Sequence, residues 1–190
     1  MISYRLQVER YIYQASLYEF TLGAFNALYP YEDFIPNWHI KVICDELQGE
    51  IERIARGEPK TSDLNINIPP RSLKSFIASV CLNAWAWTNY PWLKFITISY
   101  SATLSIKLSR LTRELIDSFW YQNHFGDMFE RDKDTWSKSN FRTKAGGFRF
   151  ATSCGGTVTG DGGISGLMSN PLVWVVIGIG GLIVLKVVAG

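Results

Sequence analysis

The stretch Leu64–Ser75 reads Leu-Asn-Ile-Asn-Ile-Pro-Pro-Arg-Ser-Leu-Lys-Ser, and it decides the fold. Apolar and polar residues alternate from Leu64 to Ile68, which is the period of a short β-strand. Two prolines then stop the strand, because proline has no N–H to donate to a β-ladder. Lys74-Ser75 opens an apolar run to Trp87 that contains no Gly or Pro. We therefore predict a strand, a tight turn and a buried helix.

This layout is that of a phosphate-binding loop. A helix N-terminus offers free N–H groups and the positive end of its dipole to an anion. In such a loop Lys74 would meet the β- and γ-phosphates, and the Ser75 hydroxyl would bind Mg²⁺. The usual glycines are missing, however, because Leu73 and Ile68 stand where a Walker A loop has Gly. The simple pattern alone favours an ordinary strand–turn–helix.

A family resemblance changes this interpretation. Residues 69–75, Pro-Pro-Arg-Ser-Leu-Lys-Ser, resemble the deviant Walker A loop of the large terminase subunits of tailed phages, which often begins Pro-Pro-Arg and ends Lys-Ser. The resemblance implies ATP and Mg²⁺ as cofactors. It also implies that the phosphates are bound by Arg71, Ser72, Lys74 and Ser75, with Ser75 reaching them through the metal.

Further segments resemble the same family in the same order along the chain. An aromatic Pro-x-Trp-His segment precedes the loop, and its likeness implies that Trp38 and His39 lie near the adenine. Gly146-Gly147-Phe148-Arg149, with the glycine-rich segment 151–163, resembles the region upstream of Walker B. The resemblance implies that Arg149 contacts a neighbour's nucleotide or DNA; a solvent-facing strand arginine is the alternative. The likeness runs from about Phe34 to Gly163.

The predicted fold class is α/β. We expect a partial P-loop NTPase sheet of the ASCE type with flanking helices, a β-hairpin and a C-terminal apolar helix. Helical periodicity predicts one or two helices over residues 3–28 and others over about 38–56, 75–87 and 102–117. Strands are expected at 64–68 and 94–100. The hairpin would join 137–143 to 148–153, and aromatic residues 119–125 would cap the sheet edge.

The family pattern stops after Gly163. A Walker B pair of carboxylates should follow, yet Asp161 is the last acidic residue of the chain. Hydrolysis needs one carboxylate to hold Mg²⁺ and another to polarise the attacking water. We therefore predict no catalytic residue, and we divide the chain into a terminase-like ATPase part, 1–163, and an unrelated apolar tail, 164–190. The resemblance implies the first part of a terminase ATPase, and we expect it to be truncated before Walker B and to lack the nuclease domain.

The tail carries no charge from Leu172 to Leu185. If Lys186 snorkels, the apolar segment extends to Ala189, close to the shortest length that spans a bilayer. We expect a helix, possible membrane association through Leu172–Ala189, and a cytoplasmic body. The alternative is a buried strand, Val173–Ile177, in the Walker B position of the sheet.

Composition adds broad limits. With 190 residues and 47% hydrophobic content, one domain with a sizeable core is expected, and a net charge of +2 argues neither for nor against nucleic acid. The leading hypothesis is part of a viral DNA-packaging ATPase in the host cytoplasm. Its family implies double-stranded DNA, a portal, a small terminase subunit and a homo-oligomeric ring as partners. The alternative is a small non-catalytic membrane protein anchored by its C-terminal segment.

Overall fold

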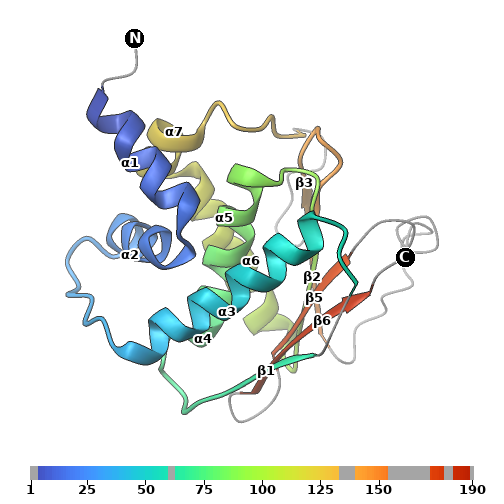
Figure 1. The fold of residues 1–190 in the computed structure, drawn as a ribbon. Helices are drawn as coiled ribbons and strands as arrows, with labels where there is room; N and C mark the ends of the chain where they lie inside the picture. Colours follow the sequence, from blue (N-terminus) through green and yellow to red (C-terminus); the bar gives the residue numbers. More distant parts are fainter. Residues whose placement is uncertain (1–3, 60–62, 133–139, 154–171, 178–181, 189–190) are drawn as a thin grey trace.

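A computed structural model describes residues 4–59, 63–132, 140–153, 172–177 and 182–188 (Figure 1). The chain forms a mixed α/β fold. Its elements are, in order, α1 (Tyr4–Ala15), α2 (Leu17–Leu28), α3 (Trp38–Ala55), β1 (Leu64–Asn67), α4 (Lys74–Phe76), the π-helix η1 (Ile77–Cys81), α5 (Leu82–Asn89), β2 (Lys94–Ser99), α6 (Ala102–Asp117), α7 (Phe119–Phe125), β3 (Asn140–Arg142), β4 (Phe148–Ser153), β5 (Leu172–Ile177) and β6 (Leu182–Val188).

The strands form one sheet in the order β1-β6-β5-β2-β4-β3. β2 pairs in parallel with both β4 and β5, whereas β6 is antiparallel to both of its neighbours and β3 is antiparallel to β4. β1, β5, β2 and β4 therefore point in one direction. Their carboxyl ends meet at one edge of the sheet, which is where open α/β sheets bind ligands.

The predicted helix after the loop is present, and it is longer than expected. α4, η1 and α5 follow one another without a break from Lys74 to Asn89. Its residues from Phe76 to Thr88 are all buried, because α2, α3 and α6 surround it on the sheet. The all-round apolar sequence of this segment is what such a position requires.

The described helices lie on one side of the sheet (Figure 1). The main core fills the space between them and that face, and it includes Trp85, Trp87 and Phe95. The prediction that the aromatic residues of α7 cap the sheet edge is wrong. They pack largely on helices instead: Trp120 lies 5.2 Å from Tyr13 of α1 and 5.3 Å from Phe20 of α2, centroid to centroid.

The predicted hairpin is confirmed. β3 and β4 pair antiparallel, with Asn140 opposite Phe150 and Arg142 opposite Phe148. Gly146 adopts a φ of +91° in the connecting turn, a conformation that glycine allows without strain.

The C-terminal helix predicted for Leu172–Ala189 is wrong. These residues supply β5 and β6, and the alternative strand Val173–Ile177 lies within β5, directly beside β2. Valine and isoleucine dominate both segments, and their β-branched side chains favour strands. Glycines at 178, 180 and 181 separate two runs of ordinary strand length. None of the helices in the described part of the chain combines the length and the apolar character that a membrane crossing needs.

Candidate functional site: the Pro69–Ser75 loop and its groove

The loop after β1 has the backbone pattern of an anion-binding nest, and it forms this pattern without glycine. Arg71 and Leu73 have φ of 65° and 60°, and no other non-glycine residue among those described has positive φ. Positive and negative φ therefore alternate from Arg71 to Lys74. Such alternation turns successive N–H groups toward one concave side, which forms an anion-binding nest. The loop adopts this shape at a cost, because left-handed backbone is unfavourable for residues with a Cβ.

Lys74 closes the loop from inside. Its side chain is only 5% exposed, and Nζ donates hydrogen bonds of 2.8 Å and 2.7 Å to the carbonyls of Ile68 and Pro69. Burial lowers the pKa of the Lys74 ammonium. An ammonium has three N–H donors, so one remains for a phosphate oxygen while the carbonyls hold the other two. The contacts place a buried positive charge at the base of the nest.

The other predicted loop residues take different places. The Ser72 hydroxyl donates a 2.6 Å bond to the Pro69 carbonyl, so it closes the turn. Ser75 is half-buried in the first helical turn, and its hydroxyl has no hydrogen-bond partner among the described residues. That free hydroxyl fits the role of a Mg²⁺ ligand. Arg71 is exposed on the turn, where its guanidinium can move toward a bound phosphate.

The helix start itself is open to a ligand. Leu73 occupies the N-cap position, and no side chain caps the first turn. The N–H groups at this N-terminus therefore lack the partner that a Ser or Asp cap would give them, and they suit an anion. The loop follows the carboxyl end of β1, on the same sheet edge as the Ser99–Ser101 turn after β2.

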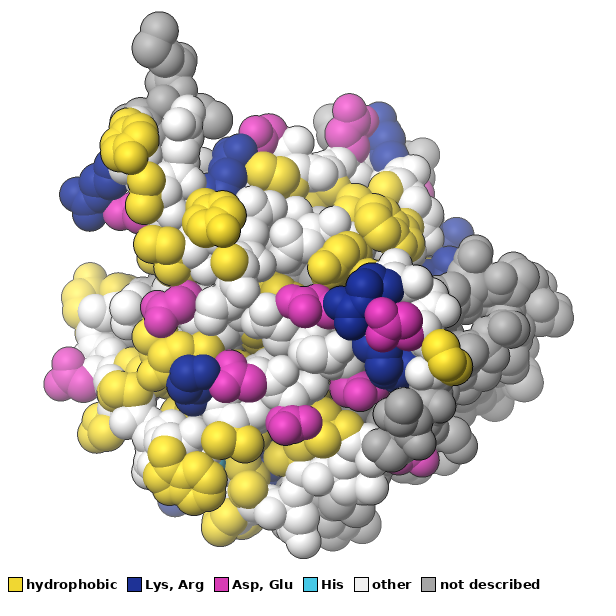
Figure 2. Space-filling model, viewed as in Figure 1, with side chains coloured by type: hydrophobic (Ala, Val, Ile, Leu, Met, Phe, Trp, Pro, Cys, Tyr) yellow, Lys and Arg dark blue, Asp and Glu magenta, His cyan; other side chains and the backbone are white. Residues whose placement is uncertain are grey.

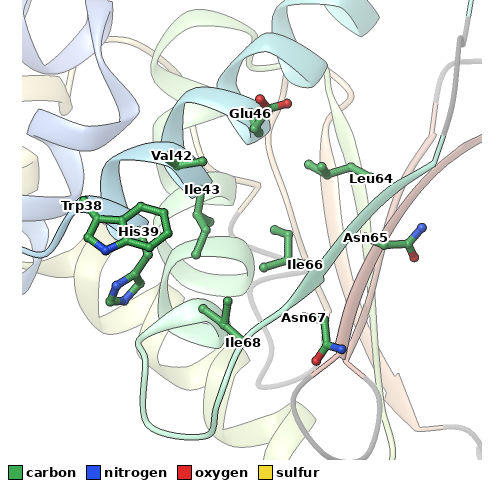
Figure 3. A pocket seen from close by; sticks show the side chains of 10 residues that line it. All are labelled: Trp38, His39, Val42, Ile43, Glu46, Leu64, Asn65, Ile66, Asn67 and Ile68. Atoms are coloured by element: carbon green, nitrogen blue, oxygen red, sulfur yellow. The ribbon is translucent and has the colours of Figure 1, made fainter.

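Trp38 and His39 line a groove of about 220 Å³ beside β1 (Figure 3). Ile66 and Ile68 point from the strand toward α3 and form the opposite wall, while Asn65 and Asn67 point the other way. Ile68 also supplies a carbonyl to Lys74, so the groove and the loop adjoin. The groove is smaller than the roughly 300–1,000 Å³ of drug-sized pockets, and it suits one flat ring.

Two features of the groove favour an aromatic ligand. Trp38 is 77% exposed, and its ring lies edge-on to His39 at 6.1 Å. The Nε2 atom of His39 is buried and has no hydrogen-bond partner among the residues that the structure describes. A heteroaromatic ring bound here would stack on an exposed indole and meet an unused imidazole nitrogen.

Arg149 does not occupy the place predicted for it. Its side chain is completely buried on β4, so it faces neither solvent nor a neighbouring subunit nor DNA. Nη2 donates a 3.2 Å bond to the Ser79 carbonyl, and the guanidinium lies 5.8 Å from the Phe141 ring centroid. Nε and Nη1 have no hydrogen-bond partner in the described part of the chain. Burial lowers the pKa of Arg149 to about 9.

The sequence analysis missed the polar cluster around Ser79. This residue lies in η1, and its carbonyl accepts hydrogen bonds from several side chains. Besides Arg149, that carbonyl lies 3.1 Å from both Asn83 Nδ2 and Thr112 Oγ1. Ser79 and Asn83, four residues apart in an otherwise apolar helix, were the available signal. The cluster ties the helix behind the loop to α6 and β4.

None of the described strands that point toward the loop ends in a carboxylate. The strands that point toward it end in Asn67, Ser99, Ser153 and Ile177. Within the described ranges no group of three His, Cys, Asp or Glu side chains could hold a metal ion. The loop therefore offers Mg²⁺ the Ser75 hydroxyl and whatever oxygens a bound phosphate brings. The segment 154–163, with Asp161, lies outside the described residues.

Comparisons with models of protein families, with curated proteins and with solved structures find no match to this chain. The function must therefore be argued from the site.

Proposed function

We propose that this chain binds ATP with Mg²⁺ through the Pro69–Ser75 loop, as the nucleotide-binding part of a terminase-type DNA-packaging ATPase. The observation that carries the proposal is the position of Lys74. A buried ammonium lies at the base of a loop with alternating φ signs, at the start of a helix and at the carboxyl end of a strand. Lysine, nest and helix N-terminus all favour a phosphate at the same point.

The groove beside β1 supports a nucleotide over a simple phosphate. It adjoins the loop through Ile68 and offers Trp38 and His39 to a base. In this proposal Mg²⁺ is held by Ser75 and by the phosphates, and it neutralises their charge. The resemblance of residues 34–163 to large terminase subunits adds double-stranded DNA, a portal, a small terminase subunit and a ring of copies as proposed partners. A P-loop NTPase arrangement of the sheet is part of the same proposal.

The alternative of a membrane protein anchored by its C-terminus rested on a helix. Because Leu172–Ile177 and Leu182–Val188 form strands of the sheet, the predicted helix no longer supports that alternative. We do not carry the alternative forward.

Titration with a fluorescent ATP analogue and Mg²⁺ tests the proposal. We expect Lys74→Ala to abolish binding, because it removes the charge that meets the phosphates. Lys144→Ala is the matched control, since it removes a lysine that is paired with Glu130 on the exposed hairpin. Trp38→Ala should weaken binding of ATP but not of inorganic triphosphate, which has no base. Equal affinity in Lys74→Ala and parent protein would overturn the assignment.

A further inference from the structure

The Pro69–Ser75 loop, which we call the phosphate loop, begins its helix with a left-handed residue. Leu73 is the N-cap of α4, and its carbonyl accepts a 2.9 Å hydrogen bond from the Ile77 N–H. The N-caps of α2, α3 and α6 have extended backbone instead, with φ between −140° and −124°. Leu73 has φ 60° and ψ 1°. Glycine adopts this conformation without a steric cost, whereas leucine does not.

The Leu73 side chain has a packing position that glycine could not use. It is half-buried and packs on the main hydrophobic core. It also lines a groove of about 330 Å³ between α2, the phosphate loop and α6, which we call the α6 groove. The other apolar side chains of this lining are Phe25, Tyr29, Phe76, Leu104, Leu108 and Leu111. Removal of the leucine carbons from water stabilises the folded loop, so favourable packing and unfavourable φ belong to the same residue.

Arg71 has positive φ as well, but its side chain is not packed in this way. It is exposed, and it lines neither the α6 groove nor the groove beside β1. The nest needs both left-handed residues, because the alternation of φ signs turns successive N–H groups to one side. Leu73 is therefore the residue of the nest whose side-chain packing can hold the backbone in shape.

Long-range charge adds little to this site. Basic and acidic side chains are interspersed on the face drawn in Figure 2, and the formal net charge of the chain is +2. A face of mixed sign lacks the broad positive field that concentrates anions. The affinity of the proposed site then depends on the Lys74 ammonium and on the shape of the phosphate loop.

We propose that Leu73 is a positioning residue, whose packed side chain holds the phosphate loop in the left-handed conformation that binds ATP. The inference rests on the proposed function, since ATP is the ligand that the loop is expected to take. Truncation to alanine keeps the Cβ, and with it the steric cost, but removes the packing. The loop should then populate conformations with negative φ at residue 73, and only the remaining fraction binds ATP. Glycine removes the packing and the steric cost together.

Titration with the fluorescent ATP analogue and Mg²⁺ tests the proposal. We expect Leu73→Ala to bind about tenfold more weakly, the population shift that a left-handed residue with a Cβ implies. Leu73→Gly should stay within about threefold of the parent, because glycine adopts the conformation unaided. Leu73→Met should bind like the parent, since methionine has a similar volume and fits irregular space. Leu111→Ala shortens a leucine of the same groove on ordinary helix, and this control should keep the parent's affinity.

The order of alanine and glycine is the decisive result. If Leu73 served only the packing of the fold, or if its side chain touched the nucleotide, glycine would be at least as harmful as alanine. Binding by Leu73→Gly that is no tighter than binding by Leu73→Ala would therefore overturn the proposal. Parent affinity in Leu73→Ala would contradict it equally.

A measurement without ligand separates this proposal from the proposed function. A positive φ brings the amide and α protons of one residue close together, and a nuclear Overhauser effect in the NMR spectrum detects that distance. We expect a strong effect at residue 73 in the parent and in Leu73→Met, and a weak one in Leu73→Ala. If the parent binds the analogue no better than Lys74→Ala does, the proposed function fails, and the NMR result still decides whether Leu73 holds the loop. An unchanged effect in Leu73→Ala would overturn that role whatever the titrations show.

Discussion

The Arg149 guanidinium on β4 donates a 3.2 Å hydrogen bond to the main-chain carbonyl of Ser79, in the π-helical turn behind the phosphate loop. That bond joins the sheet to the helix that begins at Lys74. It is the only hydrogen bond of this guanidinium among the described residues, and two of its three nitrogens are buried without partners. The fold therefore maintains a buried charge with little compensation.

We predict that Arg149→Met is at least as stable as the parent, with a free energy of unfolding up to about 3 kcal/mol higher. A buried charge is often replaced by an apolar side chain of similar length at no cost. Arg149→Ala should instead lower the free energy of unfolding by about 2–3 kcal/mol, because it leaves a cavity. Urea unfolding of the three proteins measures this. A clear loss in Arg149→Met would mean that the bond to Ser79 and the contact with Phe141 outweigh desolvation.

The left-handed backbone of the loop predicts a stabilising substitution. Arg71 is exposed at φ 65°, where a residue with a Cβ costs roughly 1–2 kcal/mol relative to glycine. Arg71→Gly should raise the free energy of unfolding by up to about 1 kcal/mol, after the entropy that glycine adds to the unfolded chain. Ala145→Gly, in an exposed turn with negative φ, is the control and should lower stability. A loss in both variants would contradict the strain argument.

Two glycines make a matched pair with opposite expected signs. A Cβ at Gly147 would lie 2.2 Å from the Pro91 carbonyl oxygen and 2.9 Å from that of Leu93. Backbone atoms cannot move away without distorting the fold. Gly147→Ala should therefore lower the free energy of unfolding by about 2 kcal/mol or more, on the order of other overpacking changes. A Cβ at Gly49 meets nothing within 4 Å on α3, so Gly49→Ala should stabilise by about 1 kcal/mol. Thermal unfolding of both variants checks the pair.

The pKa of Lys74 predicts how ATP affinity depends on pH. Burial lowers this pKa below the ordinary lysine value of 10.5, so the unliganded protein loses the ammonium proton at a lower pH than the unfolded chain does. Affinity should therefore fall as the pH rises toward 10, while the unliganded fold gains stability over the same range, because the unfolded state binds the proton more tightly. Titrations between pH 7 and about 10 test this. Any binding retained by Lys74→Arg should depend less on pH there, since the ordinary pKa of arginine lies well above that of lysine.

Sequence reasoning located the loop, the helix behind it and the hairpin, because each follows from local periodicity or turn chemistry. Alternation at Leu64, Ile66 and Ile68 was sufficient to predict the strand. Sequence reasoning predicted the wrong secondary structure for the tail, because an uncharged apolar run of Val, Ile and Gly is compatible with a helix or a strand. The pairing of β5 with β2 decides between them, and that contact is not local.

The burial of Arg149 and the orientation of α1 could not be predicted either, because both depend on contacts between distant parts of the chain. The burial of Arg149 depends on α6, which packs on β4, and on η1, whose Ser79 carbonyl it binds, and nothing beside it in the sequence marks this. The orientation of α1 depends on Asp127 and His124, more than a hundred residues away. Helical periodicity predicts a stripe, but it does not tell which side the protein covers.

The last prediction concerns turnover: the chain should hydrolyse ATP negligibly. Phosphoryl transfer rests on positioned charge around the γ-phosphate and the metal, and it needs a group that orients the attacking water. β5 lies beside β2, yet it ends in Ile177, and no Asp or Glu follows Asp161 in the sequence. Phosphate release from purified protein, with Lys74→Ala as the blank, should match that blank even where the fluorescent analogue binds. Turnover clearly above the blank would mean that a carboxylate from another segment reaches the loop. Asp161→Asn would then identify it, because loss of turnover in that variant alone would place the carboxylate at the γ-phosphate.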